Sequence, residues 1–188
     1  MKHFLFFILL VGLVSCAKNE VTPTIPANTL RLTVRSKQVT FPARPATIVL
    51  SAQGMRWALS AKAADADSTT ISIDAASSEQ SLEAPATYSG ILSNSPARSA
   101  NSVYGYRVPL DFNNACGTTI YQGNNITYTT TSIPYGLTNG LPEFTLTIIT
   151  VDAVAHTMSG TFAGTYWKGC DKLAITDGQF NLPYTVKP

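Results

Sequence analysis

Apolar and polar residues alternate over many short stretches of the chain. Four stretches place apolar side chains at every second position: residues 30–34, 55–61, 104–112 and 180–186. A period of two is typical of a β-strand with one buried face and one solvated face. Five weaker candidate strands follow from shorter patterns: residues 38–41, 46–52, 69–74, 87–92 and 126–131. Trp57 lies on the apolar side of its strand, so we expect it to anchor the core.

The strongest single unit is a hairpin near the C-terminus, with arms at residues 144–151 and 157–166 joined by a short loop. The first arm becomes apolar on both faces at Ile148 and Ile149, which predicts a central strand that is covered on both sides. Gly160 and Gly164 on the second arm leave room for a large side chain of the first arm across the pair.

Three segments do not follow the strand pattern. Residues 75–86 hold Ser, Glu, Gln and Leu before Pro85, and they predict one or two turns of helix. Residues 93–101 are rich in Ser and predict a loop. Residues 113–142 are rich in Thr, Asn, Gly and Tyr, and we expect loops on both sides of the strand at residues 126–131.

Roughly eight to ten short strands without a long helix predict an all-β fold, either an antiparallel β-sandwich or a flattened barrel. The alternative is an up-and-down barrel of the calycin type. The two alternatives differ in whether the middle is packed or hollow.

The N-terminus has a different pattern. Lys2 and His3 precede a continuous apolar run at residues 4–14, which ends in Ser15 and Cys16. At about 1.5 Å per residue this run spans roughly 16 Å, which is too short to cross a bilayer. The pattern predicts a secretory signal peptide. The alternative is an ordinary secreted protein whose signal happens to contain a cysteine.

The stretch Leu13-Val14-Ser15-Cys16 resembles a bacterial lipobox. This resemblance implies that Cys16 is diacylated, that the chain is cut before it, and that the acyl chains hold the protein on a membrane. Ala17 stands where the inner-membrane retention signal has Asp, which implies the outer membrane. Residues 17–20 partly resemble the export signal of Bacteroidota lipoproteins, which implies a position facing the cell exterior, with the periplasmic face as the alternative.

Residues 17–28 contain two prolines and little apolar periodicity, so they predict a tether of roughly 35 to 40 Å when extended. The chain therefore divides into a signal peptide at residues 1–15, a lipidated Cys16 with its tether at residues 16–28, and one β-domain at residues 29–188.

Composition limits the classes of partner. The chain is 45% hydrophobic and 13% charged, with a formal net charge of +2 and scattered Lys and Arg, which argues against nucleic acid. Cys116 and Cys170 are the cysteines other than Cys16. In an oxidising compartment we expect them to form a disulfide, which contributes about 4 kcal/mol in the chain-entropy description. The alternative is two free thiols.

The candidate catalytic groups have simpler explanations. His156 falls in the predicted hairpin loop, so an exposed turn residue is favoured over a catalytic triad. Asp65, Asp67, Asp111 and Asn113 lack the spacing of an EF-hand and are typical of turns. Without a His cluster or a second Cys pair we expect no metal and no cofactor. We expect no enzymatic activity, with a glycan-acting hydrolase as the alternative.

Tyr121, Tyr128 and Tyr135 lie in an Asn-rich segment whose composition is typical of a sugar-binding surface. The alternative is that these tyrosines are part of the strand framework. Asp67-Ser68-Thr69 resembles the O-glycosylation sequon of Bacteroidota, which implies a glycan at Ser68.

The C-terminal third carries a family resemblance. Met158-Ser159-Gly160-Thr161-Phe162 and Thr176-Asp177-Gly178-Gln179-Phe180 resemble the closing strands of small uncharacterised Bacteroidota lipoproteins. Residues 32–41 loosely resemble the opening hairpin of that family, with Ser36 where Gly is usual. The resemblance implies an all-β surface lipoprotein domain and carries over no catalytic residue.

We therefore expect a membrane-anchored, non-enzymatic lipoprotein that binds a glycan or a surface protein or has a structural role. A calycin-like carrier of an apolar ligand is a further alternative.

Overall fold

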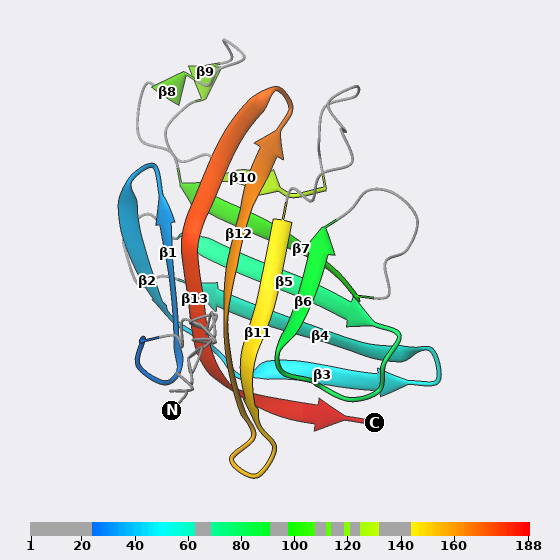
Figure 1. The fold of residues 1–188 in the computed structure, drawn as a ribbon. Helices are drawn as coiled ribbons and strands as arrows, with labels where there is room; N and C mark the ends of the chain where they lie inside the picture. Colours follow the sequence, from blue (N-terminus) through cyan, green and yellow to red (C-terminus); the bar gives the residue numbers. More distant parts are fainter. Residues whose placement is uncertain are drawn as a thin grey trace, which may run out of the picture.

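The computed structural model describes residues 24–62, 69–90, 98–107, 112–113, 119–120, 125–131 and 144–188. These residues form thirteen β-strands and no α-helix (Figure 1), which confirms the predicted all-β class. Accordingly, the described part of the chain has no helix long and apolar enough to cross a membrane.

The strands are β1 (Thr29–Val34), β2 (Lys37–Pro42), β3 (Ala46–Ser51), β4 (Gly54–Lys62), β5 (Thr70–Ser77), β6 (Ala86–Gly90), β7 (Arg98–Arg107), β8 (Phe112–Asn113), β9 (Thr119–Ile120), β10 (Asn125–Thr129), β11 (Phe144–Asp152), β12 (Thr157–Lys168) and β13 (Asp171–Lys187). Eleven of them form one mixed sheet, and β8 pairs with β9 separately.

The large sheet folds into two crossed layers (Figure 1). β6, β11, β12 and β13 run across β3, β4, β5 and β7, and the β1–β2 hairpin extends the first layer beyond β13. β13 joins the layers on one side, because it pairs with β12 and, nearer its end, with β3. β6 joins them on the other side, because it pairs with β11 and contacts β7. This arrangement agrees with a sandwich or a flattened barrel.

The sheet is not wholly antiparallel, contrary to the prediction. The pairs β13–β3 and β6–β7 are parallel. An up-and-down barrel has only antiparallel neighbours. The two parallel pairs therefore distinguish this topology from the calycin-type alternative.

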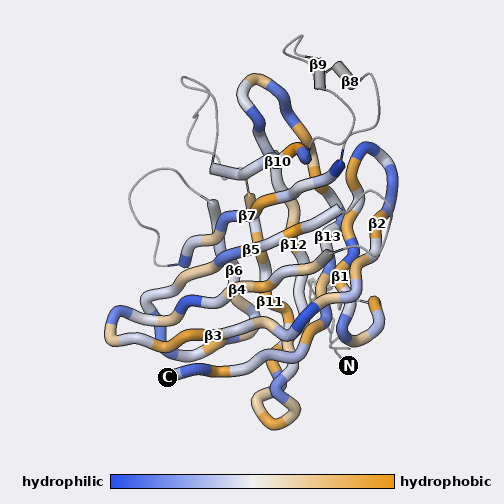
Figure 2. The backbone as a smooth tube through the Cα atoms, turned by 180° about the vertical axis from the view of Figure 1, so that it is seen from behind, coloured by the Kyte–Doolittle hydropathy of each residue, from blue (hydrophilic) through white to orange (hydrophobic). Residues whose placement is uncertain are grey.

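One hydrophobic core fills the space between the layers. Figure 2 shows apolar and polar residues alternating along the strands, and most of the apolar positions are buried. Trp57 is 2% exposed and meets Tyr88 edge to face with ring centroids 5.7 Å apart. Trp57 is thus a core anchor, as predicted, and the middle of the domain is packed.

Two glycines and two phenylalanines interlock where β12 meets β13. Gly160 lies opposite Phe180, and Phe162 lies opposite Gly178. A Cβ atom on Gly160 would overlap the Phe180 ring, and one on Gly178 would overlap the Phe162 ring. Each glycine therefore makes room for the ring of the facing strand, which for Gly160 is β13 and not, as the sequence predicted, the other arm of the hairpin. These four residues belong to the two motifs that carry the family resemblance.

The β11–β12 hairpin is confirmed, but β11 is not covered on both faces. Ile148 is fully buried and Ile149 is half-buried. The register with β12 shifts between Ile148 and Thr150, so Ile149 is the extra residue of a β-bulge. The two adjacent isoleucines mark this bulge.

Three other sequence predictions are wrong. Residues 75–86 form no helix: β5 continues to Ser77, the Ser77 hydroxyl accepts a hydrogen bond from the Glu79 amide (3.0 Å), and bends follow. The predicted loop at residues 93–101 overlaps β7, which begins at Arg98. β13 is 17 residues long and begins well before residue 180, because it contributes to both layers.

The last part of the predicted tether belongs to the folded domain. Ile25 is 5% exposed, and its carbonyl accepts a hydrogen bond from Asn181 Nδ2 at 3.2 Å. The Asn28 carbonyl accepts one from the Ala43 amide at 2.9 Å. Ile25 and Asn28, which the sequence assigned to the tether, are therefore part of the folded domain.

Candidate functional site

A pocket opens beside the turn between β1 and β2. The central residues of this turn, Arg35 and Ser36, have φ angles of 48° and 62°. Positive φ at both positions is typical of the type I′ turn, whose twist matches that of a two-residue hairpin. Val34 pairs with Lys37 directly before and after the turn. The turn therefore places two cationic side chains, those of Arg35 and Lys37, at the same end of the hairpin.

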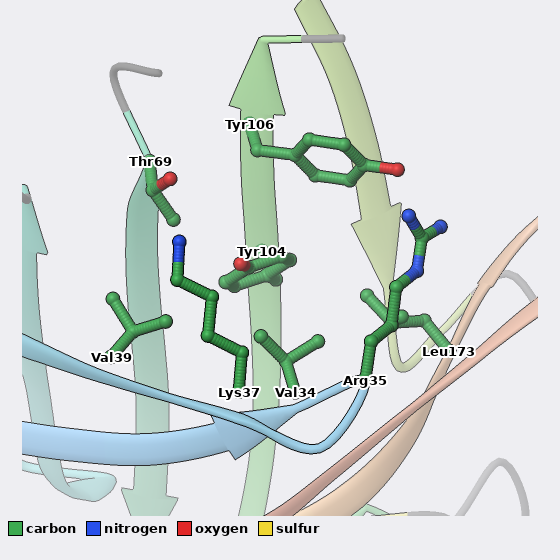
Figure 3. Close-up of a pocket in the computed structure, with 8 residues that line it drawn as sticks. All are labelled: Val34, Arg35, Lys37, Val39, Thr69, Tyr104, Tyr106 and Leu173. Atoms are coloured by element: carbon green, nitrogen blue, oxygen red, sulfur yellow. The ribbon is translucent and has the colours of Figure 1, made fainter. Parts of the chain in front are cut away.

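The pocket has a volume of about 230 Å³ and an amphipathic lining (Figure 3). Its lining residues come from β1, β2, β5, β7 and β13 and from the segments beside them: Val34, Arg35, Lys37, Val39, Thr69, Tyr104, Tyr106 and Leu173. Three of these side chains are aliphatic, two are aromatic and two are cationic. Sites that bind small molecules commonly combine an apolar lining with a few polar groups.

The two cations lie on opposite sides of Tyr104 (Figure 3). The Arg35 guanidinium carbon is 5.4 Å from the centroid of the Tyr106 ring, which is a cation–π contact. Lys37 extends along Val39 toward Thr69. Lys37 forms no salt bridge with any residue that the structure describes. The two charged side chains in the described lining are therefore both positive.

Stacked tyrosines form the wall behind Arg35. Tyr106 lies 6.0 Å from Tyr104 and 6.1 Å from Tyr128 between ring centroids, and its plane is within 12° of that of Tyr128. Tyr128 is fully buried, and its hydroxyl donates a hydrogen bond to Asp171 Oδ2 at 2.6 Å. Burial, together with this hydrogen bond to Asp171, raises the pKa of Tyr128. The Tyr128 hydroxyl is therefore a fixed neutral donor.

The Tyr106 hydroxyl, by contrast, is buried and has no hydrogen-bond partner of good geometry among the described residues, although its proximity contributes to the raised pKa of Tyr128. It points toward the side of the pocket where the Arg35 guanidinium lies (Figure 3). A buried hydroxyl without a partner costs roughly 1 to 3 kcal/mol of free energy, so such groups are uncommon in folded proteins. The wall of the pocket thus contains a polar atom that a bound molecule can satisfy.

The layers behind the pocket are held by a second tyrosine. The Tyr166 hydroxyl donates to Ser102 Oγ at 2.7 Å, and Ser102 Oγ donates to the Ser72 carbonyl at 2.7 Å. Burial raises the pKa of Tyr166, although the hydrogen bond to Ser102 opposes the shift. This chain of hydrogen bonds connects β12 to β7 and β5, so it fixes the strand that carries Tyr104 and Tyr106.

Of the three tyrosines predicted to bind a sugar, the structure describes only Tyr128. Tyr128 is 0% exposed, so its ring is not available for stacking on a sugar, contrary to that prediction and in agreement with a framework role. Tyr121 and Tyr135 lie outside the described residues. Ser68, in the motif that resembles an O-glycosylation sequon, lies outside them as well.

The cysteines are only partly described. Cys170 lies in the turn between β12 and β13 and is disulfide-bonded. Its predicted partner, Cys116, and the predicted lipidation site, Cys16, lie outside the described residues, so both assignments stay predictions.

The other candidate groups are placed as follows. His156 is an exposed turn residue with φ of 51°, as predicted, and its ring contacts Tyr184 edge to face at 5.4 Å. Asp65, Asp67 and Asp111 lie outside the described residues. Within the described ranges, no three His, Cys, Asp or Glu side chains gather into a group that could hold a metal ion.

Sequence reasoning did not find the pocket. It placed Tyr104 and Tyr106 on one strand face and expected a turn near Lys37, but it connected neither with a site. The pocket forms only because β7 crosses under the β1–β2 hairpin and β13 brings Leu173 beside it. The available signal was the basic turn Arg35-Ser36-Lys37, which becomes informative only beside the tyrosines.

Comparison with protein-family models, with curated proteins and with solved structures found no match for this chain.

Proposed function

We propose that this protein is a bacterial outer-membrane lipoprotein of the Bacteroidota type, anchored through acylated Cys16, whose β-domain is a non-catalytic binding module. The observation that carries the proposal is the amphipathic pocket at the β1–β2 turn. We infer that this pocket holds a small ligand. We also infer that the domain carries a Cys116–Cys170 disulfide.

The position of the pocket supports this proposal. The described chain enters the domain at Thr24, and Ile25 is held there by Asn181. The pocket lies at the other end of β1, whose 6 residues span roughly 20 Å (Figure 1). The chain between Cys16 and Thr24 reaches at most about 28 Å. An anchor at Cys16 would therefore be attached to the end of the domain opposite the pocket.

The shape of the site favours a small molecule over an extended glycan. Stacking on sugars needs exposed ring faces, whereas Tyr128 is fully buried and Tyr104 is 4% exposed. A concave site with aliphatic, aromatic and cationic groups suits a compact ligand with apolar and polar parts. In our proposal the domain therefore captures a small amphipathic molecule at the cell surface, with the periplasmic face as the alternative location.

The anchor is tested by replacing the thiol that would be acylated. We expect Cys16→Ser to move the protein from the membrane fraction to the soluble fraction, whereas Ser15→Ala, which keeps the cysteine and a small residue before it, remains on the membrane. Mass spectrometry of the mature N-terminus checks the attached lipid. A Cys16→Ser protein that stays on the membrane would contradict the anchor.

The pocket is tested by filling it. Val39 points into the pocket from β2 and is half-buried, whereas its neighbour Gln38 is exposed. Native mass spectrometry of protein purified from its native host shows whether a small molecule is bound. We expect Val39→Trp to abolish this binding, whereas Gln38→Trp should leave the molecule bound. A ligand that survives Val39→Trp in a folded protein would exclude this pocket as the binding site.

A further inference from the structure

We propose that the ligand of this pocket is a small organic anion, a carboxylate with a short apolar body. The inference rests on the proposed binding function, which it makes specific. It is argued from the charge, the lining and the size of the pocket.

The charge favours an anion. Among the described residues that line the pocket, Arg35 and Lys37 are the charged ones, and both are positive. Lys37 is exposed and makes no salt bridge with a described residue, so its ammonium group can meet a ligand. Arg35 lies against the Tyr106 ring, which fixes the position of its guanidinium. Ammonium and guanidinium groups form their strongest hydrogen bonds with anionic oxygens.

The lining favours a ligand that also has an apolar part. Val34, Val39 and Leu173 present aliphatic side chains to the space between the two cations (Figure 3). An inorganic anion would leave these surfaces in contact with water, whereas a hydrocarbon chain or a single ring would cover them. The unpartnered Tyr106 hydroxyl adds a neutral donor beside Arg35. A carboxylate oxygen placed there would give this buried hydroxyl the acceptor that it lacks.

The size limits the apolar part. The pocket of about 230 Å³ is smaller than the roughly 300–1,000 Å³ that is typical of sites for drug-sized ligands. A phospholipid or a long acyl chain would therefore extend far outside it. A carboxylate with a short chain or one ring matches both the volume and the two kinds of lining.

The test compares three probes that share one chain and differ in the head group: octanoate, octanol and octylamine. Each is titrated into the full mature chain carrying Cys16→Ser, and amide chemical shifts or calorimetry give the affinity. We expect octanoate to bind about tenfold to a hundredfold more tightly than octanol, because charge-assisted hydrogen bonds contribute only to the anion. We expect octylamine to bind most weakly.

The variants assign the head-group contact to Lys37. We expect Lys37→Gln to weaken octanoate by about tenfold and to leave octanol unchanged. Lys187→Gln is the matched control, because it removes the same charge from an exposed position at the far end of β13. Thermal unfolding of each variant verifies that it is folded, and Val39→Trp should abolish the binding of all three probes.

Failure of the ligand class and failure of the binding function give different results. If octanol equals octanoate, if octylamine binds most tightly, or if Lys37→Gln changes nothing, the anionic ligand is wrong while a binding pocket remains. If no probe binds and Val39→Trp leaves the ligand content of the native protein unchanged, the proposed binding function is wrong as well.

Discussion

The middle of the β12–β13 pair and the surroundings of the β1–β2 turn are built on different principles. Along the middle of β12 and β13, Gly160 and Gly178 face Phe180 and Phe162, and a single added carbon would overlap a ring. Around the β1–β2 turn, the side chains instead enclose a space of about 230 Å³ and include a buried hydroxyl without a partner. The first region is optimised for packing, whereas the second retains features that do not favour stability. Such features are expected where a protein binds something.

The largest effect should come from adding one carbon to the packed region. Gly160→Ala would place a Cβ against the Thr147 carbonyl and the Phe180 ring, so we expect it to reduce the free energy of unfolding by about 3 kcal/mol. Urea unfolding measures this change. In Gly160→Ala/Phe180→Leu the loss should persist, because the Thr147 backbone carbonyl, and not the ring, is the atom nearest to the added carbon.

Gly169→Ala is the control for this prediction. Gly169 has φ of 59° but no atom within 4 Å of an added Cβ, so its substitution costs only the backbone strain, about 1 kcal/mol. Equal losses for Gly160→Ala and Gly169→Ala would show that close packing is not what distinguishes the β12–β13 region.

The strands of the packed region could be predicted from the sequence because their causes are local, whereas the pairing of Gly160 with Phe180 could not. An alternating pattern fixes which face of a strand is buried, and the spacing of Gly160 from Phe162 recurs between Gly178 and Phe180. The helix predicted before Pro85 failed for a long-range reason. Glu79 binds Arg98 with two hydrogen bonds, at 2.9 Å and 2.8 Å, and this pairing between distant residues holds the segment in a bend.

The pocket could not be predicted from the sequence, because it too depends on contacts between residues far apart in the chain. Leu173 and Tyr104 belong to strands in different layers, and only the crossing of the layers brings them together. An alternating pattern indicates on which face of a sheet each side chain lies, but it does not indicate which other strand that side chain will contact. The parallel pair β13–β3 was equally invisible, because no local pattern records which strands become neighbours.

An effect that is smaller for each residue should appear at alkaline pH, and it involves both regions. Burial raises the pKa of Tyr88, Tyr128 and Tyr166 above the ordinary value of 10.0. The folded state therefore holds these protons more tightly than the unfolded state does. The stability that they contribute is complete below about pH 10 and is lost as the pH rises above it, by about 1.4 kcal/mol per pH unit for each tyrosine.

Urea unfolding between roughly pH 8 and pH 11 measures this loss. Tyr166→Phe removes one titrating group from the packed region and Tyr128→Phe removes one from the wall of the pocket, so each should make the decline above pH 10 less steep. A stability that stays constant across this range would contradict the role of burial at these tyrosines.

The smallest effect should be a gain in stability at the pocket. Ser36 has φ of 62°, a conformation that glycine adopts without steric cost, so Ser36→Gly should stabilise the β1–β2 hairpin by roughly 0.5 to 1 kcal/mol. Ser36→Ala is the control, because alanine keeps the steric cost and should give no gain. The exposed side chain of Ser36 does not line the pocket, so the affinity for octanoate should be the same in both variants and in the wild type. A change in affinity with Ser36→Gly would instead mean that the rigid turn itself positions Arg35 and Lys37, and that stability and binding are linked at this end of the domain.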